Sequence, residues 1–419
     1  MRYSKINVNF FKSNRKKIIN YLKPNSLVII NSNDIMPKDE DGLMSFKQNN
    51  DIFYFSGIEQ ENTILLLYPD SKNKIYKEIL FLQKPNNLID AWDGDKYTKK
   101  SASMVSGVFS IYWLDSFELI LKILAYQVDN IYLNTNEHTR SCSNVQTRDE
   151  RFINWCKNKY PLHSYCRIAP IIYKIRSIKS EFEINLIRKA IKITETGLKK
   201  IFSLLKPGIM EYEIEAKLIY EFINFRSKGF GFSPIIASGV NNCILHYIKN
   251  NQKCKSNDLL LLDIGAEYAN YSSDVTRVLP INGRFNKRQK GVYSVVLNTL
   301  NYAKKIILPG LSISNYNKEI NSFMQEEFLS LKLTKDKKRF KEYFPHNITH
   351  YLGLNIHDVG DINKIFKPGM VLTIEPGIYI KEEGFGVRLE NNIVIKNNSI
   401  EDITKNIPIK IEEIESLMN

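Results

Sequence analysis

The sequence has little that would place the protein in a membrane or in an oxidising compartment. No apolar run approaches the roughly 20 residues that cross a bilayer. The first residues, MRYSKINVNFFKSNRKK, do not resemble a secretory signal. The five cysteines are odd in number and lack CxxC spacing, which predicts reduced thiols and argues against a thiolate metal site. We therefore expect a cytoplasmic protein with no membrane partner.

A concentrated basic patch is also missing. Lysine and arginine number 59 against 45 acidic residues, a net charge of +14, but the excess is spread over separate pieces such as KSNRKK, DKYTKK and LTKDKKRFK. Nucleic-acid binding needs basic side chains gathered on one face, so we expect no nucleic-acid partner. The composition is that of a globular protein, and 419 residues suffice for two or three domains with buried cores.

The first 172 residues alternate strand-like and helix-like segments. SLVIINS, NTILLLYP, KEILFLQ and NIYLNT are typical of strands, and FELILKILAYQ and RFINWCKNKY are typical of helices. This alternation predicts an α/β domain. FKQNNDIFYFSGI combines aromatic and polar side chains, and we expect it to be a loop followed by a strand.

A domain boundary is expected near residue 172, so residues 173–419 form a second domain. Ser180 and Glu183 form a capping box that opens a helix ending before Pro207, and a second helix is expected to reach Gly229. The same order of elements recurs around Pro309: a helix, a Pro-Gly stop, another helix and then strands. This repeat indicates an internal duplication with pseudo-two-fold symmetry.

Four carboxylates and one imidazole lie in apolar, strand-like stretches of this second domain. They are Asp263, Asp274, His350, Glu375 and Glu390. Acidic side chains are depleted in strand interiors, and a buried charge is costly unless it is compensated. If the five converge, they form a site for two hard divalent cations, which can make water a nucleophile at neutral pH. Oxygen ligands with a single imidazole favour Mn(II), Fe(II) or Co(II) over a structural zinc.

Two local patterns favour convergence. IGAEYANYSS contains a glycine and an asparagine that can turn the chain, so a hairpin would bring Asp263 beside Asp274; alternatively the two acids are turn or cap residues. Arg388 stands two residues before Glu390 and shares its face on a strand, so it can pair with a ligand carboxylate. A surface arginine and glutamate are the alternative.

Histidine is scarce, with six in the chain, and three fall within twelve residues: His346, His350 and His357. A fourth, His246, lies in SGVNNCILHYIKN, and we assign no role to His138 or His163. Scattered histidines are usually core or surface residues. Their concentration beside acidic strands favours a functional site.

Several motifs together resemble a known family. ASGVNNCILHY, LLDIGAEYANYSSDVTRVLP-NGRF, H-x3-H-x-LGL-x2-HDVG, KPGMVLTIEPGIYI and GFGVRLE are similar to those of the pita-bread metallopeptidases, and among them to the aminopeptidase P group. FKQNNDIFYFSGIEQENTILLL resembles the creatinase-like N-terminal domain of that group. The resemblance implies a creatinase-like α/β domain followed by a pita-bread catalytic domain of the α+β class.

The resemblance also implies a reaction at two divalent metal ions per subunit, Mn(II) for preference. Asp263 would bind one metal, Asp274 and Glu390 would bridge both, and His350 and Glu375 would complete the shells. A metal-bridging hydroxide would attack the bond before a proline in the second position of a peptide. Glu375 would carry the proton to the leaving amine.

Other roles are implied in the same way. His246 and His357 would hold the substrate and stabilise the tetrahedral intermediate, and His346 would line the substrate pocket. Arg388, in the substrate site, would orient a metal-bound carboxylate, and Trp92 would reach a neighbouring subunit's site. The family forms dimers or tetramers, so we expect a homo-oligomer.

The chain departs from the family pattern at four asparagines: Asn347, Asn355, Asn391 and Asn392. None is a proposed metal ligand, so the departures bear on pocket shape and rate. The expected function is that of an Xaa-Pro aminopeptidase. A prolidase is the alternative, against which Thr349 counts because prolidases more often have glycine there. A non-catalytic binding protein of this fold typically loses ligands, and here all five are present.

Overall fold

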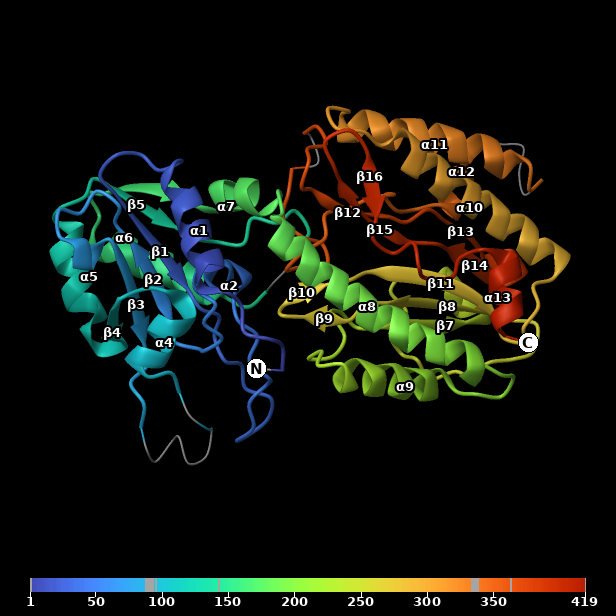
Figure 1. The fold of residues 1–419 in the computed structure, drawn as a ribbon, viewed down its shortest axis with the longest axis horizontal. Coiled ribbons are helices and arrows are strands. Elements are labelled where there is room, and N and C mark those ends of the chain that lie inside the picture. The colour runs from blue at the N-terminus through green and yellow to red at the C-terminus, as the bar shows by residue number, and fades with distance from the viewer. Residues whose placement is uncertain are drawn as a thin grey trace. The chain divides into compact units, whose positions relative to one another are not determined.

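The computed structural model describes residues 2–86, 94, 96–141, 144–332, 339–361 and 364–418. Trp92, to which an intersubunit role was attributed, lies outside the described residues. The chain forms two compact units (Figure 1). One comprises Lys5–Ile175, and the other comprises Met1–Ser4 together with Arg176–Asn419.

The first unit is built on a six-stranded mixed sheet with the order β4-β3-β2-β1-β5-β6. Its strands are β1 (Ser26–Asn31), β2 (Ile64–Leu67), β3 (Glu78–Leu82), β4 (Ser110–Trp113), β5 (Asn130–Leu133) and β6 (Ser164–Arg167). Its helices are α1 (Val8–Ile19), α2 (Asn50–Ser56), α4 (Lys99–Ser106), α5 (Phe117–Ala125), α6 (Arg148–Lys159) and α7 (Ala169–Arg176). The predicted strands and helices of this α/β unit are confirmed, with one exception.

The exception is FKQNNDIFYFSGI, where the expected strand is wrong. Residues Asn50–Ser56 form helix α2, because Asn49 caps its start and Gly57, with a φ of 69°, ends it. Every residue from Ile52 to Ser56 is buried, so the segment has no polar face from which a helical period could be recognised.

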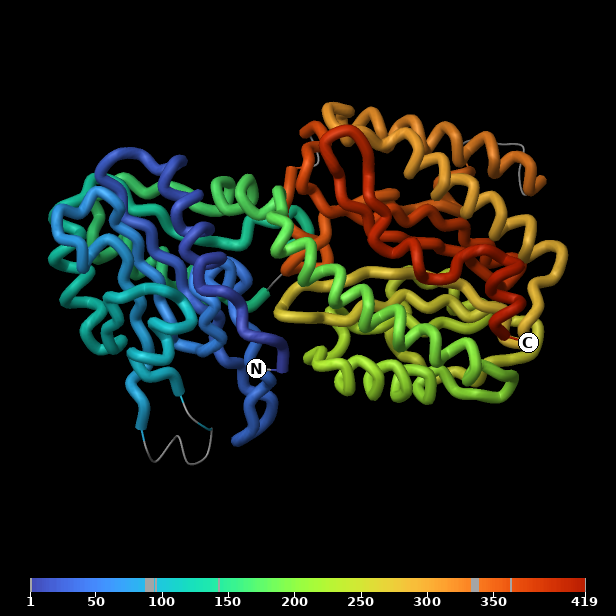
Figure 2. The backbone as a smooth tube through the Cα atoms, viewed as in Figure 1, coloured from blue at the N-terminus to red at the C-terminus, as the bar shows by residue number. Residues whose placement is uncertain are grey.

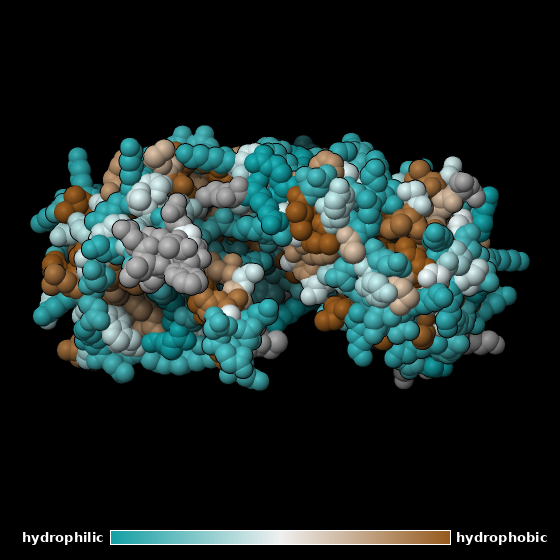
Figure 3. Space-filling view, turned by 90° about the horizontal axis from the view of Figure 1, so that it is seen from below, coloured by the Kyte–Doolittle hydropathy of each residue, from teal (hydrophilic) through white to brown (hydrophobic). Residues whose placement is uncertain are grey.

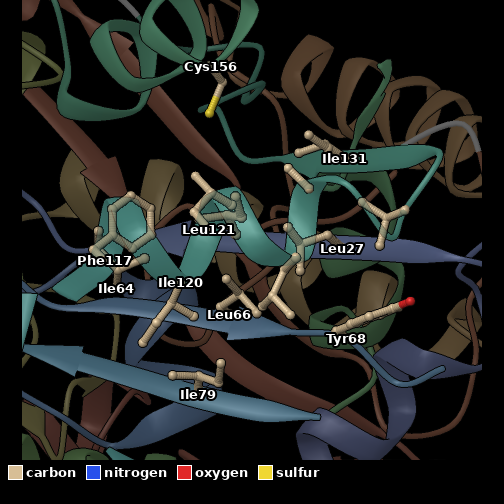
Figure 4. Close-up of a cluster of buried hydrophobic side chains, with 14 of the residues drawn as sticks. Leu27, Ile64, Leu66, Tyr68, Ile79, Phe117, Ile120, Leu121, Ile131 and Cys156 are labelled. Atoms are coloured by element: carbon tan, nitrogen blue, oxygen red, sulfur yellow. The ribbon is translucent and has the colours of Figure 1, made fainter. Parts of the chain in front are cut away.

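The core of this unit lies between the sheet and helix α5 (Figure 4). Phe117, Ile120 and Leu121 of the helix lie in one buried cluster with Leu27 of β1 and Leu66 of β2. Cys156 of α6 joins the same cluster and is fully buried.

The second unit begins with two helices that pack on each other. The second of them contacts a three-stranded sheet, and the first contacts the short antiparallel pair of β9 (Glu267–Tyr268) and β10 (Tyr271–Ser272). The elements are α8 (Glu181–Leu204), α9 (Glu211–Asn224), β7 (Ile235–Ser238), the 3-10 turn η3 (Gly239–Cys243), β8 (Leu259–Ile264) and β11 (Val275–Pro280). The predicted Ser180 capping box is confirmed. Helix α9 ends before the expected Gly229, and Arg226 beyond it has a φ of 71°, which an α-helix cannot accommodate.

The same order of elements follows a second time. Helices α10 (Lys287–Ile306) and α11 (Ile313–Leu329) precede strands β12 (Val371–Ile374), β15 (Asn391–Ile395) and β16 (Ile400–Asp402), which form a second three-stranded sheet. Between them β13 (Gly377–Ile380) and β14 (Phe385–Arg388) form an antiparallel pair, and α13 (Ile411–Leu417) ends the chain. Figure 2 shows α10 alongside α11, as α8 lies alongside α9.

Across the described ranges, no helix combines the length and apolar character needed to cross a membrane. The face drawn in Figure 3 is mostly hydrophilic, with separate hydrophobic side chains between the polar ones.

Candidate metal centre and active site

Strands β8 and β11 bring the two aspartates together. They pair antiparallel, with Thr276 opposite Asp263, and Asp274 stands one residue before β11. The chain turns between them at Ala269 and Asn270, whose φ angles of 54° and 66° are left-handed. The predicted hairpin is confirmed.

Both glutamates lie at breaks between strands, so the expected strand-interior positions are wrong. Glu375 follows β12 and precedes Pro376, which has no N–H to continue a strand ladder. Glu390 lies between β14 and β15, and its N–H donates to the Thr276 carbonyl at 3.1 Å. Because these two residues lie outside the strands, their side chains do not follow the alternation between the two faces of a sheet.

Three of the predicted ligands form a group that can hold a metal ion. Ligand atoms of Asp274, His350 and Glu390 all lie within 4.8 Å of one another. His350 Nε2 lies 3.4 Å from Asp274 Oδ2 and 3.5 Å from Glu375 Oε1, so Glu375 borders the same space.

Burial and mutual repulsion act strongly on these carboxyl groups. Burial, followed by repulsion from Asp263, raises the pKa of Asp274 well above its usual range. Burial, followed by repulsion from Asp274, does the same to the pKa of Glu390. Burial raises the pKa of Glu375 to about 7, with the His350 imidazole opposing the shift. Without a cation, these carboxyl groups therefore stay protonated to a higher pH in the folded protein than they would in water.

The donor set fits a hard divalent cation. Two buried carboxylate oxygens, Asp263 Oδ1 and Glu390 Oε1, have no hydrogen-bond partner among the described residues. Buried polar atoms are rarely left unpaired, and a metal ion would satisfy both while offsetting the repulsion among the carboxylates.

His350 presents Nε2 to the cluster. Its Nδ1 lies 2.9 Å from the Tyr351 carbonyl, which can only accept, so in the neutral imidazole Nδ1 carries the proton and Nε2 offers its lone pair. Thr373 also holds the backbone of this residue: the His350 N–H donates to Thr373 Oγ1, and the Thr373 N–H donates to the His350 carbonyl. Such support orients a metal-binding imidazole.

A chain of polar contacts connects Asp263 to His346. Arg388 Nη2 donates to Asp263 Oδ2 at 2.7 Å, and Arg388 Nη1 donates to the Tyr379 hydroxyl at 2.8 Å. The Tyr379 hydroxyl lies 2.8 Å from His346 Nε2, and His346 Nδ1 lies 3.9 Å from Glu375 Oε2. Burial raises the pKa of Tyr379 to about 12, so the phenol stays neutral. Tyr379 was not predicted as a site residue, although it stands four residues after Glu375. On a continuous strand, that even spacing would place both side chains on one face.

Thr276 and Asn392 were also missed. The Thr276 hydroxyl donates to Glu390 Oε2 at 2.7 Å, and the Asn392 side chain accepts from the Asp274 N–H at 3.1 Å. Thr276 lies two residues after Asp274, a spacing that would have identified it. Asn392, noted only as a departure from the family pattern, fixes the backbone of a proposed ligand.

The remaining two histidines are placed differently. The rings of His357 and His350 meet edge to face, with centroids 4.4 Å apart, so His357 adjoins the cluster. His246 follows η3, which packs against β14 and β8, the strands that carry Arg388 and Asp263. His246 is exposed, and no described contact joins it to the ligand group.

Comparison with known proteins agrees with this geometry. Residues 185–397 match the model of metallopeptidase family M24, and residues 11–132 match the aminopeptidase P N-terminal domain. The chain is 30% identical to the Xaa-Pro aminopeptidase of Haemophilus influenzae over 98% of this chain and 97% of that protein. It is 29% identical to the Xaa-Pro aminopeptidase of Escherichia coli over 99% and 98%. The structure of zinc-substituted E. coli aminopeptidase P in complex with product has a TM-score of 0.89 and 28% identity, with 99% of each chain covered.

The predicted two-domain fold is thereby confirmed, an N-terminal aminopeptidase P domain followed by a pita-bread domain. The M24 match covers just over half of the chain and contains Asp263, Asp274, His350, Glu375 and Glu390. The protein belongs to metallopeptidase family M24, with the domain arrangement of aminopeptidase P.

Proposed function

We propose that this chain is an Xaa-Pro aminopeptidase, which hydrolyses the bond between an N-terminal residue and a following proline. The observation that carries the proposal is the convergence of Asp274, His350 and Glu390 in an M24 domain. Relatives that match almost the whole chain are named Xaa-Pro aminopeptidases, which supports this substrate class.

The site holds two divalent metal ions per subunit, with Mn(II) as the preferred ion. The ligands are Asp263, Asp274, His350, Glu375 and Glu390. When bound, such ions make water a nucleophile at neutral pH and polarise a carbonyl group. Four carboxylates with one imidazole form a hard ligand set that suits Mn(II) better than a structural zinc.

Glu375 is the proton shuttle between the attacking water and the leaving amine. Its side chain is 18% exposed, against 7% for Asp274 and 13% for Asp263, so it is the most accessible of these three acids. Its two oxygens face different partners, His350 on one side and His346 on the other. A carboxylate in that position can reach both the cluster and a substrate beside it.

The substrate is held by His246, His346 and His357, and Arg388 keeps Asp263 in its binding orientation. The edge-to-face contact of His357 with His350 supports a place beside the reacting carbonyl, where a donor stabilises developing negative charge. An Xaa-Pro bond has no N–H, and proline restricts the residue before it, which is the physical reason for a dedicated site.

The partners are peptides with proline in the second position, and the protein acts in the cytoplasm as a homo-oligomer. Four described cysteines, Cys156, Cys166, Cys243 and Cys254, are free thiols, which supports a reducing compartment. Residues 1–172 are the N-terminal domain and residues 173–419 the catalytic domain of each subunit.

The test compares three peptides with the Mn(II)-loaded protein: Xaa-Pro-Yaa, the dipeptide Xaa-Pro, and Xaa-Ala-Yaa as the control. Release of Xaa from the proline tripeptide, with little cleavage of the others, is expected. Cleavage of the dipeptide alone would identify a prolidase. A protein that binds metal and cleaves none of the three would be a binding protein of this fold.

A further inference from the structure

The side chain of Glu211, in the first turn of α9, is fully buried and accepts four hydrogen bonds. Its Oε1 accepts from the Ser238 N–H at 2.8 Å and from the Ser238 hydroxyl at 2.7 Å. Its Oε2 accepts from the Tyr247 hydroxyl at 2.8 Å and from the Gln252 N–H at 2.9 Å. One carboxylate thus satisfies two backbone and two hydroxyl donors that are remote from it in sequence.

These four donors belong to three residues at the two ends and in the middle of the segment that carries His246. Ser238 ends β7 directly before η3, and Gln252 lies at the far end of the same segment. Tyr247 is the neighbour of His246 in the chain. The backbone of Glu211 adds a fifth bond, from its N–H to the Gln252 carbonyl at 3.0 Å. Both ends of residues 239–251, which we call the His246 loop, are therefore fixed to the same point of α9.

Two buried asparagines complete the attachment of the His246 loop. Asn250 Oδ1 accepts from the Ile236 N–H, and its Nδ2 donates to the Pro234 carbonyl and to Glu215. Asn242 Nδ2 donates to the Leu259 carbonyl of β8. A Cβ added at Gly386 of β14 would lie 2.8 Å from the Asn242 carbonyl oxygen, so the loop and that strand are in close contact.

The loop needs polar attachment because much of its apolar surface is not buried. Val240, Ile244 and Ile248 are 56%, 51% and 58% exposed. Aliphatic side chains in that state contribute little burial energy toward fixing the backbone. The hydrogen bonds at the base of the loop therefore restrain the position of His246 together with the buried side chains of Cys243 and Tyr247.

We infer that Glu211 is a positioning residue for His246: its buried carboxylate closes the His246 loop at its base and sets where the imidazole meets the substrate. This inference rests on the proposed substrate-binding role of His246. A glutamine in the same place has one acceptor oxygen, and its NH2 group would face two of the four donors. The loop would then lose half of its anchor while the metal ligands, all on other elements, keep theirs.

The test is a double-mutant cycle of Glu211→Gln and His246→Ala, assayed in the Mn(II)-loaded protein with an Xaa-Pro-Yaa peptide. Glu211→Gln alone is expected to lower kcat/KM by about ten- to a hundredfold, because small displacements at a reacting centre have effects of that order. Bound metal per subunit should stay at the wild-type value. In the His246→Ala background the same change should cost little further activity, a non-additivity that a general loss of stability would not produce.

Glu213→Gln is the matched control. Glu213 is in the same helical turn and caps the Met210 N–H, but none of its described hydrogen bonds reaches the loop. It should keep wild-type kcat/KM. Tyr247→Phe removes one of the four bonds and keeps the carboxylate, so it should show a smaller loss of the same kind, and it decides the matter if Glu211→Gln does not fold.

The outcomes separate this inference from the proposed function. If the wild type cleaves the peptide and His246→Ala is impaired, but Glu211→Gln or Tyr247→Phe has full activity, Glu211 does not position His246. Additive losses in the cycle would overturn the inference in the same way. If His246→Ala itself has full activity, the proposed role of His246 fails first, and the inference with it.

Discussion

The guanidinium of Arg388 and the carboxylate of Asp263 form an ion pair with Nη2 and Oδ2 2.7 Å apart and side-chain exposures of 5% and 13%. Two further donors of the same guanidinium contact the Tyr379 and Thr276 hydroxyls. Arg388 thereby fixes one oxygen of Asp263, and the other, Oδ1, has no hydrogen-bond partner in the described part of the chain and is available to a cation.

Replacing Arg388 by lysine should therefore weaken metal binding while the positive charge is kept. Lysine has one compact donor group and cannot make three directed contacts at once. We expect a loss of metal affinity of about ten- to a hundredfold, as for other groups that orient ligands, and a parallel loss of kcat. Titration with Mn(II) measures both. Arg284→Lys, at an ion pair with an arginine side chain 65% exposed, is the control and should change neither.

Thr276→Val should distinguish an effect on the orientation of a metal ligand from an effect on the stability of the fold. The change keeps the shape and removes the hydroxyl that donates to Glu390 Oε2. Losing the bond to Glu390 should cost about 1 kcal/mol of stability, and the longer 3.4 Å contact from Arg388 Nε, which is lost with it, should add little. Thr299→Val, at another fully buried threonine whose hydroxyl bonds a helix carbonyl, should cost a similar amount. Only Thr276→Val should also lower metal affinity, and equal affinities in the two variants would argue against an orienting role.

His357→Ala should leave the metal in place and slow the reaction. Its ring contacts His350 edge to face, so it adjoins the ligand group without being one of the proposed ligands. We expect wild-type metal content with kcat lowered by about a hundredfold or more, since removing a donor to developing charge has effects of that size. Normal turnover would refute the role, and loss of metal would instead make His357 a part of the metal site.

Metal binding should stabilise the protein more at high pH than at low pH. Glu375 has a folded-state pKa of about 7 against about 4.3 in an unfolded chain, mainly because it is buried. The metal-free fold therefore holds a proton that the unfolded chain has lost, and this contribution to stability falls as pH rises from about 4.3 to about 7. Metal binding requires the deprotonated ligands, so Mn(II) should raise Tm strongly at about pH 8 and weakly at about pH 5. Equal shifts in thermal unfolding at both pH values would contradict this.

Parts of the fold and site followed from local signals in the sequence. The Ser180 capping box, the alternating strands of the first unit and the turn between Asp263 and Asp274 depend on neighbours in the chain, and all are present. The aromatic helix α2 was missed because all of its aromatic residues are buried, which removes the contrast between polar and apolar faces.

Contacts between residues far apart in the chain were harder to predict from the sequence. Thr276 meets Glu390 over 114 positions of sequence, and Asn392 meets the backbone of Asp274 over 118. Glu375 and Glu390 lie at strand breaks because each segment changes its pairing partner, which no single segment reveals. The four hydrogen bonds that Glu211 accepts come from three separate places in the chain, so no local sequence pattern indicates them.

The most direct test of the account measures bound metal and peptide cleavage together. Metal-stripped wild type and Glu390→Ala are titrated with Mn(II), and release of Xaa from Xaa-Pro-Yaa is followed at each step. The account predicts that wild-type activity rises as two ions bind per subunit and that Glu390→Ala binds fewer than two and stays inactive. Full cleavage by the stripped protein, or by Glu390→Ala without a second ion, would contradict it.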